Sequence, residues 1–151
     1  MNANDYTRRE ILVYWLPVVA WAAVILAASS DFFSAKHSGE WLGEIIIRIV
    51  GHPLPSREFD AVHFVIRKLA HLTEYFILGV LCYRALRGDE AGWRVRWAVV
   101  AIALAATVAV LDEWHQFFVL SRTSSGWDVL LDTAGASLAQ MAGRASARPP
   151  G

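Results

Sequence analysis

The sequence lacks the features that support several common protein classes. It contains one cysteine, Cys82, which excludes an intrachain disulfide and a CxxC metal site. Its 14 Lys and Arg residues balance its 14 Asp and Glu residues, so net charge gives no support for nucleic-acid binding. No internal repeat and no N-terminal signal peptide with an evident cleavage site can be recognised. The function must therefore be sought in how apolar runs and polar side chains are arranged.

Apolar residues dominate the chain and fall into four long segments. They make up 56% of the 151 residues, seven of which are tryptophans, and the mean hydropathy is +0.37. Such values are high for a soluble domain, and tryptophan favours the membrane–water interface. The segments are near membrane-spanning length and lie at about residues 11–28, 69–86, 97–111 and 127–141. We predict a single all-α domain over residues 1–151, an integral membrane bundle of four transmembrane helices, the first of which is retained as an uncleaved span.

Arginine residues in the short loops predict the orientation of the spans. They lie before the first span, between the second and third, and after the fourth: Arg8, Arg9, Arg84, Arg87, Arg94, Arg96, Arg144 and Arg148. Positive residues favour the cytoplasmic side. We therefore expect a multi-pass membrane protein with both termini in the cytoplasm and a disordered tail at residues 145–151.

The connection between the first two spans is then external. Its segment 41–50 (WLGEIIIRIV) places its leucine and isoleucines largely on one helical face, which predicts a short interfacial amphipathic helix. The long helix of span two should begin near Glu58, with Ser56 or Asp60 as its cap. The end of span one adds several polar residues: Ser29, Ser30, Asp31, Ser34, Lys36 and His37.

Span two opens with a polar helical face. Lys68, His71 and Tyr75 are three and four residues apart and therefore stack on one side of a helix, with Glu74 beside them. We interpret His71 as a general acid/base tuned by Glu74, which is also a candidate catalytic group. Lys68 and Tyr75 are candidate substrate-binding residues. The alternative is a structural ion-pair network, or a Lys68 side chain that reaches the membrane interface.

Span three ends in the sequence DEWHQ. Asp112 and Gln116 share a helical face there, and Glu113 is the adjacent position. Consecutive residues point about 100° apart on a helix, so the two carboxylates cannot both face one cavity squarely. We expect Asp112 to face inward with the substrate-binding candidate Gln116, and Glu113 is the alternative catalytic carboxylate.

The turn before span four carries one cation, Arg122. Its guanidinium can bind a phosphate, sulfate or carboxylate group bidentately, or it can pair with Asp128. Asp128 can also cap span four. Asp132 lies one turn deeper, where capping is impossible, so we expect a buried partner or a ligand for it. Small residues on the same helix would let another helix approach closely: Gly135, Ala136 and Ala139.

Three blocks of sequence resemble the VanZ-like family of small bacterial membrane proteins. They are KLAHLTEYFILG at 68–79, DEWHQ at 112–116 and RTSSGWDVLLDTAGA at 122–136. The resemblance covers about residues 11–140. It implies four helices in the bacterial cytoplasmic membrane and, for the family's eponymous member, low-level resistance to the glycopeptide teicoplanin.

The polar residues predict an outward-facing pocket that binds or processes a lipid-linked or anionic envelope substrate by acid/base chemistry. A transporter or flippase component and a noncatalytic partner in envelope assembly are the alternatives, so enzymatic activity stays open. Expected partners are membrane lipids and this substrate, and nucleic acid is not expected. The sequence leaves open whether the chain forms oligomers.

No metal ion or other cofactor is expected from the sequence. The candidate catalytic residues and Asp132 supply nitrogen and oxygen ligands, yet only His71 contributes a histidine to the predicted cluster. Neither HExxH nor a paired ExxH motif occurs.

Overall fold

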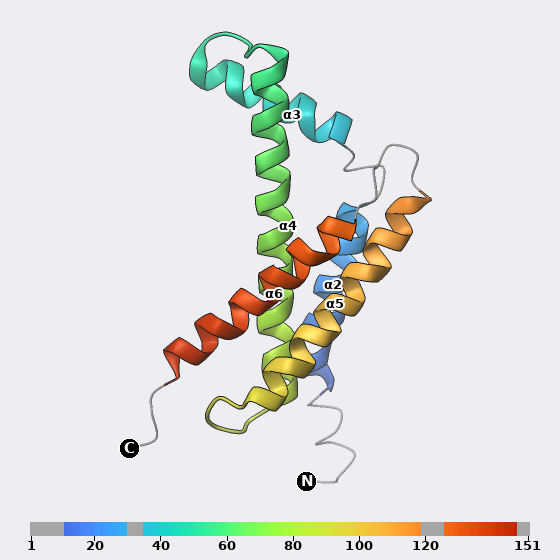
Figure 1. Ribbon diagram of the computed structural model, residues 1–151, viewed down its shortest axis with the longest axis vertical. Helices are drawn as coiled ribbons and strands as arrows, with labels where there is room; N and C mark the ends of the chain where they lie inside the picture. The colour runs from blue at the N-terminus through green and yellow to red at the C-terminus, as the bar shows by residue number, and fades with distance from the viewer. Residues whose placement is uncertain (1–10, 30–34, 119–125, 148–151) are drawn as a thin grey trace.

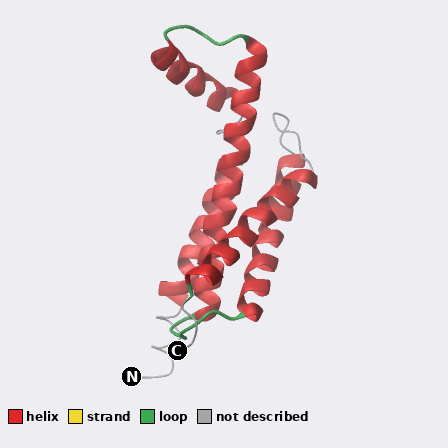
Figure 2. Ribbon diagram, turned by 60° about the vertical axis from the view of Figure 1, so that its left-hand side comes forward, coloured by secondary structure: helices red, strands yellow, loops and turns green. Residues whose placement is uncertain are grey.

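The computed structural model describes residues 11–29, 35–118 and 126–147, and within these ranges it contains helices and no strand (Figures 1 and 2). The elements are a π-helical turn η1 (Ile11–Trp15), α2 (Leu16–Ala28), α3 (Ala35–Val50), α4 (Ser56–Arg87), α5 (Val95–Phe117) and α6 (Gly126–Ser146). The predicted all-α class is therefore confirmed for the described residues.

Two of the described helical segments are long and apolar enough to cross a membrane. They are Ile11–Ala28, which joins η1 to α2, and α5. The other two predicted spans correspond to parts of α4 and α6, which carry more polar residues and do not meet the same criterion. Length and composition thus support two of the four predicted spans.

The helices pack around a core of small side chains. Contacts are most extensive between α4 and α6, and α5 packs against both. Along α5 the residues Ala101, Ala105 and Ala109 are completely buried. Because they recur every fourth residue, they form one continuous small-residue face, and neighbouring helices can approach it closely.

Helices α4 and α6 approach each other closely. A Cβ atom added at Gly135 would lie 2.5 Å from the carbonyl oxygen of Leu72, and one added at Gly79 would lie 2.9 Å from Cα of Ala136. Only glycine leaves room for the facing backbone at these positions. The prediction that small residues of α6 permit close helix packing is confirmed.

Large apolar side chains are exposed on the outside of the helices, while several ionisable side chains are buried inside the bundle. Val19 is 63% exposed and Val99 is 59% exposed, whereas Asp112 and Asp132 are completely buried. This distribution is the reverse of that in a soluble protein and is typical of helices surrounded by lipid. It indicates a membrane protein.

Several helix boundaries differ from the sequence prediction. Helix α3 has 16 residues, begins before residue 41, and lies across the end of α4 that projects from the bundle (Figure 1). Helix α5 continues to Phe117, and α6 continues through Ser146 into the segment predicted to be disordered. Pro55 occupies the N-cap of α4 without a side-chain cap, so the predicted capping by Ser56 or Asp60 is wrong.

Candidate functional site

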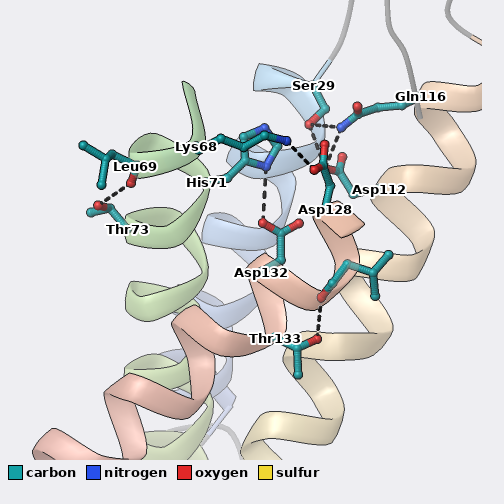
Figure 3. Close-up of polar contacts among 11 residues, drawn as sticks. Ser29, Lys68, Leu69, His71, Thr73, Asp112, Gln116, Asp128, Asp132 and Thr133 are labelled. Atoms are coloured by element: carbon teal, nitrogen blue, oxygen red, sulfur yellow. Dashed lines mark hydrogen bonds and ion pairs between the residues drawn. The ribbon is translucent and has the colours of Figure 1, made fainter. Parts of the chain in front are cut away.

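Polar side chains from separate helices meet where α2 and α5 end and α6 begins (Figure 3). This place lies partway along α4, below its projecting end (Figure 1). The residues that meet there are Ser29, Lys68, His71, Asp112, Gln116, Asp128 and Asp132. All of them except Ser29 were assigned candidate roles from the sequence. We call this group the polar cluster.

One side of the polar cluster ties the end of α2 to α5. The Ser29 hydroxyl donates a hydrogen bond of 2.9 Å to Oδ2 of Asp112, and Nε2 of Gln116 donates one of 3.0 Å to the same oxygen. Ser29 is held in place because its backbone N–H donates to the carbonyl of Ile25. All three side chains are buried. The two donors therefore fix the orientation of the Asp112 carboxylate.

The other side of the polar cluster joins α4 to α6. Nδ1 of His71 lies 3.4 Å from Oδ1 of Asp132, whose side chain is completely buried. His71 is 15% exposed, so one part of its ring remains accessible. The sequence assigned Glu74 as the partner of His71, whereas the structure places the Asp132 carboxylate beside the imidazole (Figure 3).

The ion pair between Lys68 and Asp128 lies at the rim of the polar cluster. The Lys68 ammonium donates to Oδ1 of Asp128, and their side chains are 30% and 17% exposed. The Lys68 Nζ atom also lies 5.3 Å from the centre of the Phe64 ring. The sequence left Lys68 as a substrate-binding residue, a member of an ion-pair network or a side chain that reaches the membrane interface. The structure shows it in an ion pair. Asp128 therefore contacts Lys68, and the alternative that it pairs with Arg122 involves a residue outside the described ranges.

The remaining candidates lie beside the polar cluster. Tyr75 follows His71 by one turn on the same face of α4 and is completely buried; its hydroxyl has no hydrogen-bond partner among the described residues. Glu74 is half-buried, and its backbone carbonyl accepts a hydrogen bond of 2.9 Å from Nε1 of Trp21. Glu113 is 8% exposed, so it is buried as Asp112 is. Both carboxylates are sheltered because α5 packs against α2, α4 and α6.

One predicted site residue lies outside the described part of the chain, and one residue of the polar cluster was not predicted. Arg122 lies in 119–125, outside the described residues. Ser29 was noted as polar but received no role. Ser29 lies at the very end of the first apolar run, and the third span, which runs in the same direction, ends at the same side of the bundle. That position is the sequence signal that would have found it.

The arrangement can bind a cation or transfer a proton. His71, Asp112 and Asp132 each offer a ligand atom, and these atoms lie within 4.8 Å of one another. A histidine between carboxylates can hold or release a proton near neutral pH, which suits acid/base chemistry.

Comparison with known proteins places this cluster in a family context. A model of the VanZ/LLP1 family matches residues 14–144, a range that includes every residue of the polar cluster. Comparisons with curated proteins and with solved structures found no match. Because the family match covers most of the chain and agrees with the three sequence blocks, this chain belongs to the VanZ/LLP1 family.

Proposed function

We propose that this chain is an envelope protein of the bacterial cytoplasmic membrane whose polar cluster performs acid/base chemistry on a lipid-linked or anionic substrate. The observation that carries the proposal is the completely buried Asp132, which faces His71 across the α4–α6 contact. Ionisable side chains inside apolar helix bundles are costly and commonly mark functional sites.

The chemistry rests on His71. Asp132 orients the imidazole and stabilises its protonated form, which leaves the other ring nitrogen to exchange a proton with a substrate. Asp112, held by Ser29 and Gln116, supplies a second carboxylate whose orientation is fixed. The 15% exposure of the His71 side chain provides the access that such a reaction needs.

The rim of the polar cluster supports the anionic substrate class. The Lys68 side chain is 30% exposed, so an anionic head group can reach it by replacing Asp128 as its partner. Arg122 is the second cation that we assign to this role from the sequence. A phosphate group held by these residues would lie next to His71, because Lys68 precedes it by one helical turn.

We further propose that α4 and α6 provide the second and fourth spans. At about 1.5 Å per residue, the 32 residues of α4 extend over roughly 48 Å, which exceeds a hydrocarbon core of about 30 Å. Arginines near the end of α4 and the start of α5 lie at the bundle end opposite the polar cluster: Arg84, Arg87, Arg94 and Arg96. Positive residues favour the cytoplasm, so the polar cluster would face outward.

The topology can be measured with reporter fusions. A reporter fused after Asp89 should be cytoplasmic, and one fused after Ser125 should be external. The opposite pattern would place the polar cluster on the cytoplasmic side and contradict an action on external envelope substrates.

The substrate class can be measured by native mass spectrometry of the full chain. We expect a co-purifying lipid-linked or phosphate-bearing adduct that is lost in Lys68→Ala and kept in Glu90→Gln. Glu90 is a matched control because it also forms a surface ion pair, with Arg94 at 2.9 Å, at the far end of the bundle. Equal adduct on both variants would contradict the assigned role of Lys68.

The chemistry can be tested in a teicoplanin-sensitive bacterium. Expression of the chain should lower teicoplanin sensitivity, and His71→Gln and Asp132→Asn should accumulate in the membrane without this effect. If these variants fail to accumulate, the polar cluster is a structural network. If the chain moves a substrate across liposome membranes only when an ion gradient is present, it is a transporter component instead.

A further inference from the structure

We propose that His71, Asp112 and Asp132 form a binding site for one divalent metal ion of the Mn²⁺ or Zn²⁺ class. The three side chains come from α4, α5 and α6, and their candidate ligand atoms lie within 4.8 Å of one another. The ion would hold the three helices together at the polar cluster. A bound ion would take the place of the proton between His71 and Asp132, so this proposal is separate from the acid/base chemistry proposed above and is tested independently of it.

The state of Asp132 is the first observation that points to a cation. Its side chain is completely buried, and neither of its carboxylate oxygens has a hydrogen-bond donor among the residues that the structure describes. The one ion-pair partner found for it in this part of the chain is His71. Burying a carboxylate without donors is strongly unfavourable, and a metal ion supplies both the bonds and the charge that it lacks.

The distance between His71 and Asp132 is the second observation. Their facing atoms, Nδ1 and Oδ1, are 3.4 Å apart, whereas N–H···O hydrogen bonds measure about 2.7–3.2 Å. Two ligands that each lie about 2.1 Å from a tetrahedral ion are themselves about 3.4 Å apart. The spacing therefore matches two ligands of one ion, and Asp112 offers a third ligand atom within 4.8 Å of the other two.

The surroundings of Asp112 are the third observation. Ser29 and Gln116 donate hydrogen bonds of 2.9 Å and 3.0 Å to its Oδ2 atom. Carboxylates that bind metals are commonly oriented by such neighbouring donors. The two carboxylates thus lie on opposite sides of the polar cluster. Hydrogen-bond donors orient Asp112, whereas Asp132 has no donor among the described residues.

The ligand set indicates which ions would bind. One imidazole and two carboxylates suit Mn²⁺ and Zn²⁺, because carboxylates favour the former and imidazole the latter. A neutral imidazole with two carboxylates balances the charge of a divalent ion, which removes the net charge from an apolar bundle. Three protein ligands also leave a coordination position open for water or a substrate oxygen.

The test begins with the full-length wild-type chain in detergent, after a chelator has removed bound metal. Titration with Mn²⁺ followed by electron paramagnetic resonance, and with Zn²⁺ followed by elemental analysis, should each show one ion per chain. The thermal unfolding midpoint should rise as either ion is added, because the ion binds the folded state. Absence of both binding and stabilisation in wild type overturns the proposal, and this measurement needs no variant to fold.

Variants then locate the ion. His71→Ala and Asp132→Asn should lose metal binding, and Ser29→Ala should weaken it by about 10- to 100-fold, as expected for a residue that orients a ligand. Glu90→Gln removes the same charge at the far end of the bundle and should bind as wild type does. Metal bound equally by Asp132→Asn and wild type overturns the site. A metal-free wild type in which His71→Gln still abolishes activity would refute the metal but leave the proposed function standing.

Discussion

Replacing Gly135 by alanine should separate α4 from α6 and thereby disturb the polar cluster. A Cβ atom there would lie 2.5 Å from the carbonyl oxygen of Leu72 and 3.3 Å from the backbone nitrogen of Phe76. These are backbone atoms, so no side-chain rotation can relieve the clash and α6 must move. Leu72 adjoins His71, and Asp132 precedes Gly135 by three residues. The same movement should therefore widen the gap between His71 and Asp132.

The magnitude follows from the size of the overlap. An ordinary Cβ contact begins at 3.4 Å, so the added atom stands almost 1 Å too close to Leu72. Overpacking costs about 1–3 kcal/mol, and a clash with backbone atoms belongs in the upper part of that range, at about 2–3 kcal/mol. Alanine has a higher helix propensity than glycine, which offsets about 1 kcal/mol of this cost. We expect Gly135→Ala to lose about 1–2 kcal/mol of its free energy of unfolding, which multiplies the unfolded fraction about 5- to 30-fold.

Gly143 provides a matched control on the same helix. A Cβ atom added there would meet only Cδ1 of Trp93, at 4.0 Å. Gly143→Ala should therefore gain the helix propensity of alanine without a clash, which stabilises the chain by about 0.5–1 kcal/mol. The two glycine substitutions should shift stability in opposite directions.

Cys82 offers the assay. It is the single cysteine of the chain, it lies in α4, and it is 1% exposed. A maleimide reagent should label it only after α4 is uncovered, so labelling during a denaturant titration reports unfolding. The reasoning is refuted if Gly135→Ala labels at the wild-type midpoint, or if both glycine variants shift that midpoint in the same direction.

The same labelling assay tests two hydrogen bonds that join helices. Ser29→Ala removes a donor to the buried Asp112 and should cost about 1 kcal/mol, because Gln116 still donates to the same oxygen. Its control is Ser137→Ala, which loses a bond only to the carbonyl four residues earlier in its own helix and should be nearly neutral; equal effects of the two would contradict a role for the Ser29 bond. Gln140→Leu removes a 2.9 Å bond from α6 to the Gly79 carbonyl of α4 and should also cost about 1 kcal/mol. An unchanged midpoint for Gln140→Leu would show that this bond adds nothing to stability.

The helices themselves follow closely from local sequence. Each apolar run predicted from the chain lies within a helix of the structure, because backbone groups surrounded by apolar side chains need internal hydrogen bonds. The helix ends were predicted less accurately than the helices themselves. Helix α5 continues past residue 111 to Phe117, since Asp112 and Gln116 are turned into the bundle, where the other helices shelter them.

Which polar residues gather at one end of the bundle was also predictable. Successive helices run in opposite directions, so the end of one lies beside the start of the next, and helical spacing places residues such as Lys68 and His71 on one face. This local geometry is sufficient to bring His71, Asp112 and Asp132 to the same level of the bundle.

The pairing of those residues depends on the packing of the helices. Sequence spacing assigned Glu74 to His71, whereas the structure places Asp132 there and binds Ser29 to Asp112. Partner choice across helices is set by how each helix is rotated about its axis and how closely two helices approach. The small residues of α6 predicted a close approach but not the helix that would make it. In the structure Gly135 lies against the backbone of Leu72, and this contact brings the Asp132 carboxylate to the His71 imidazole.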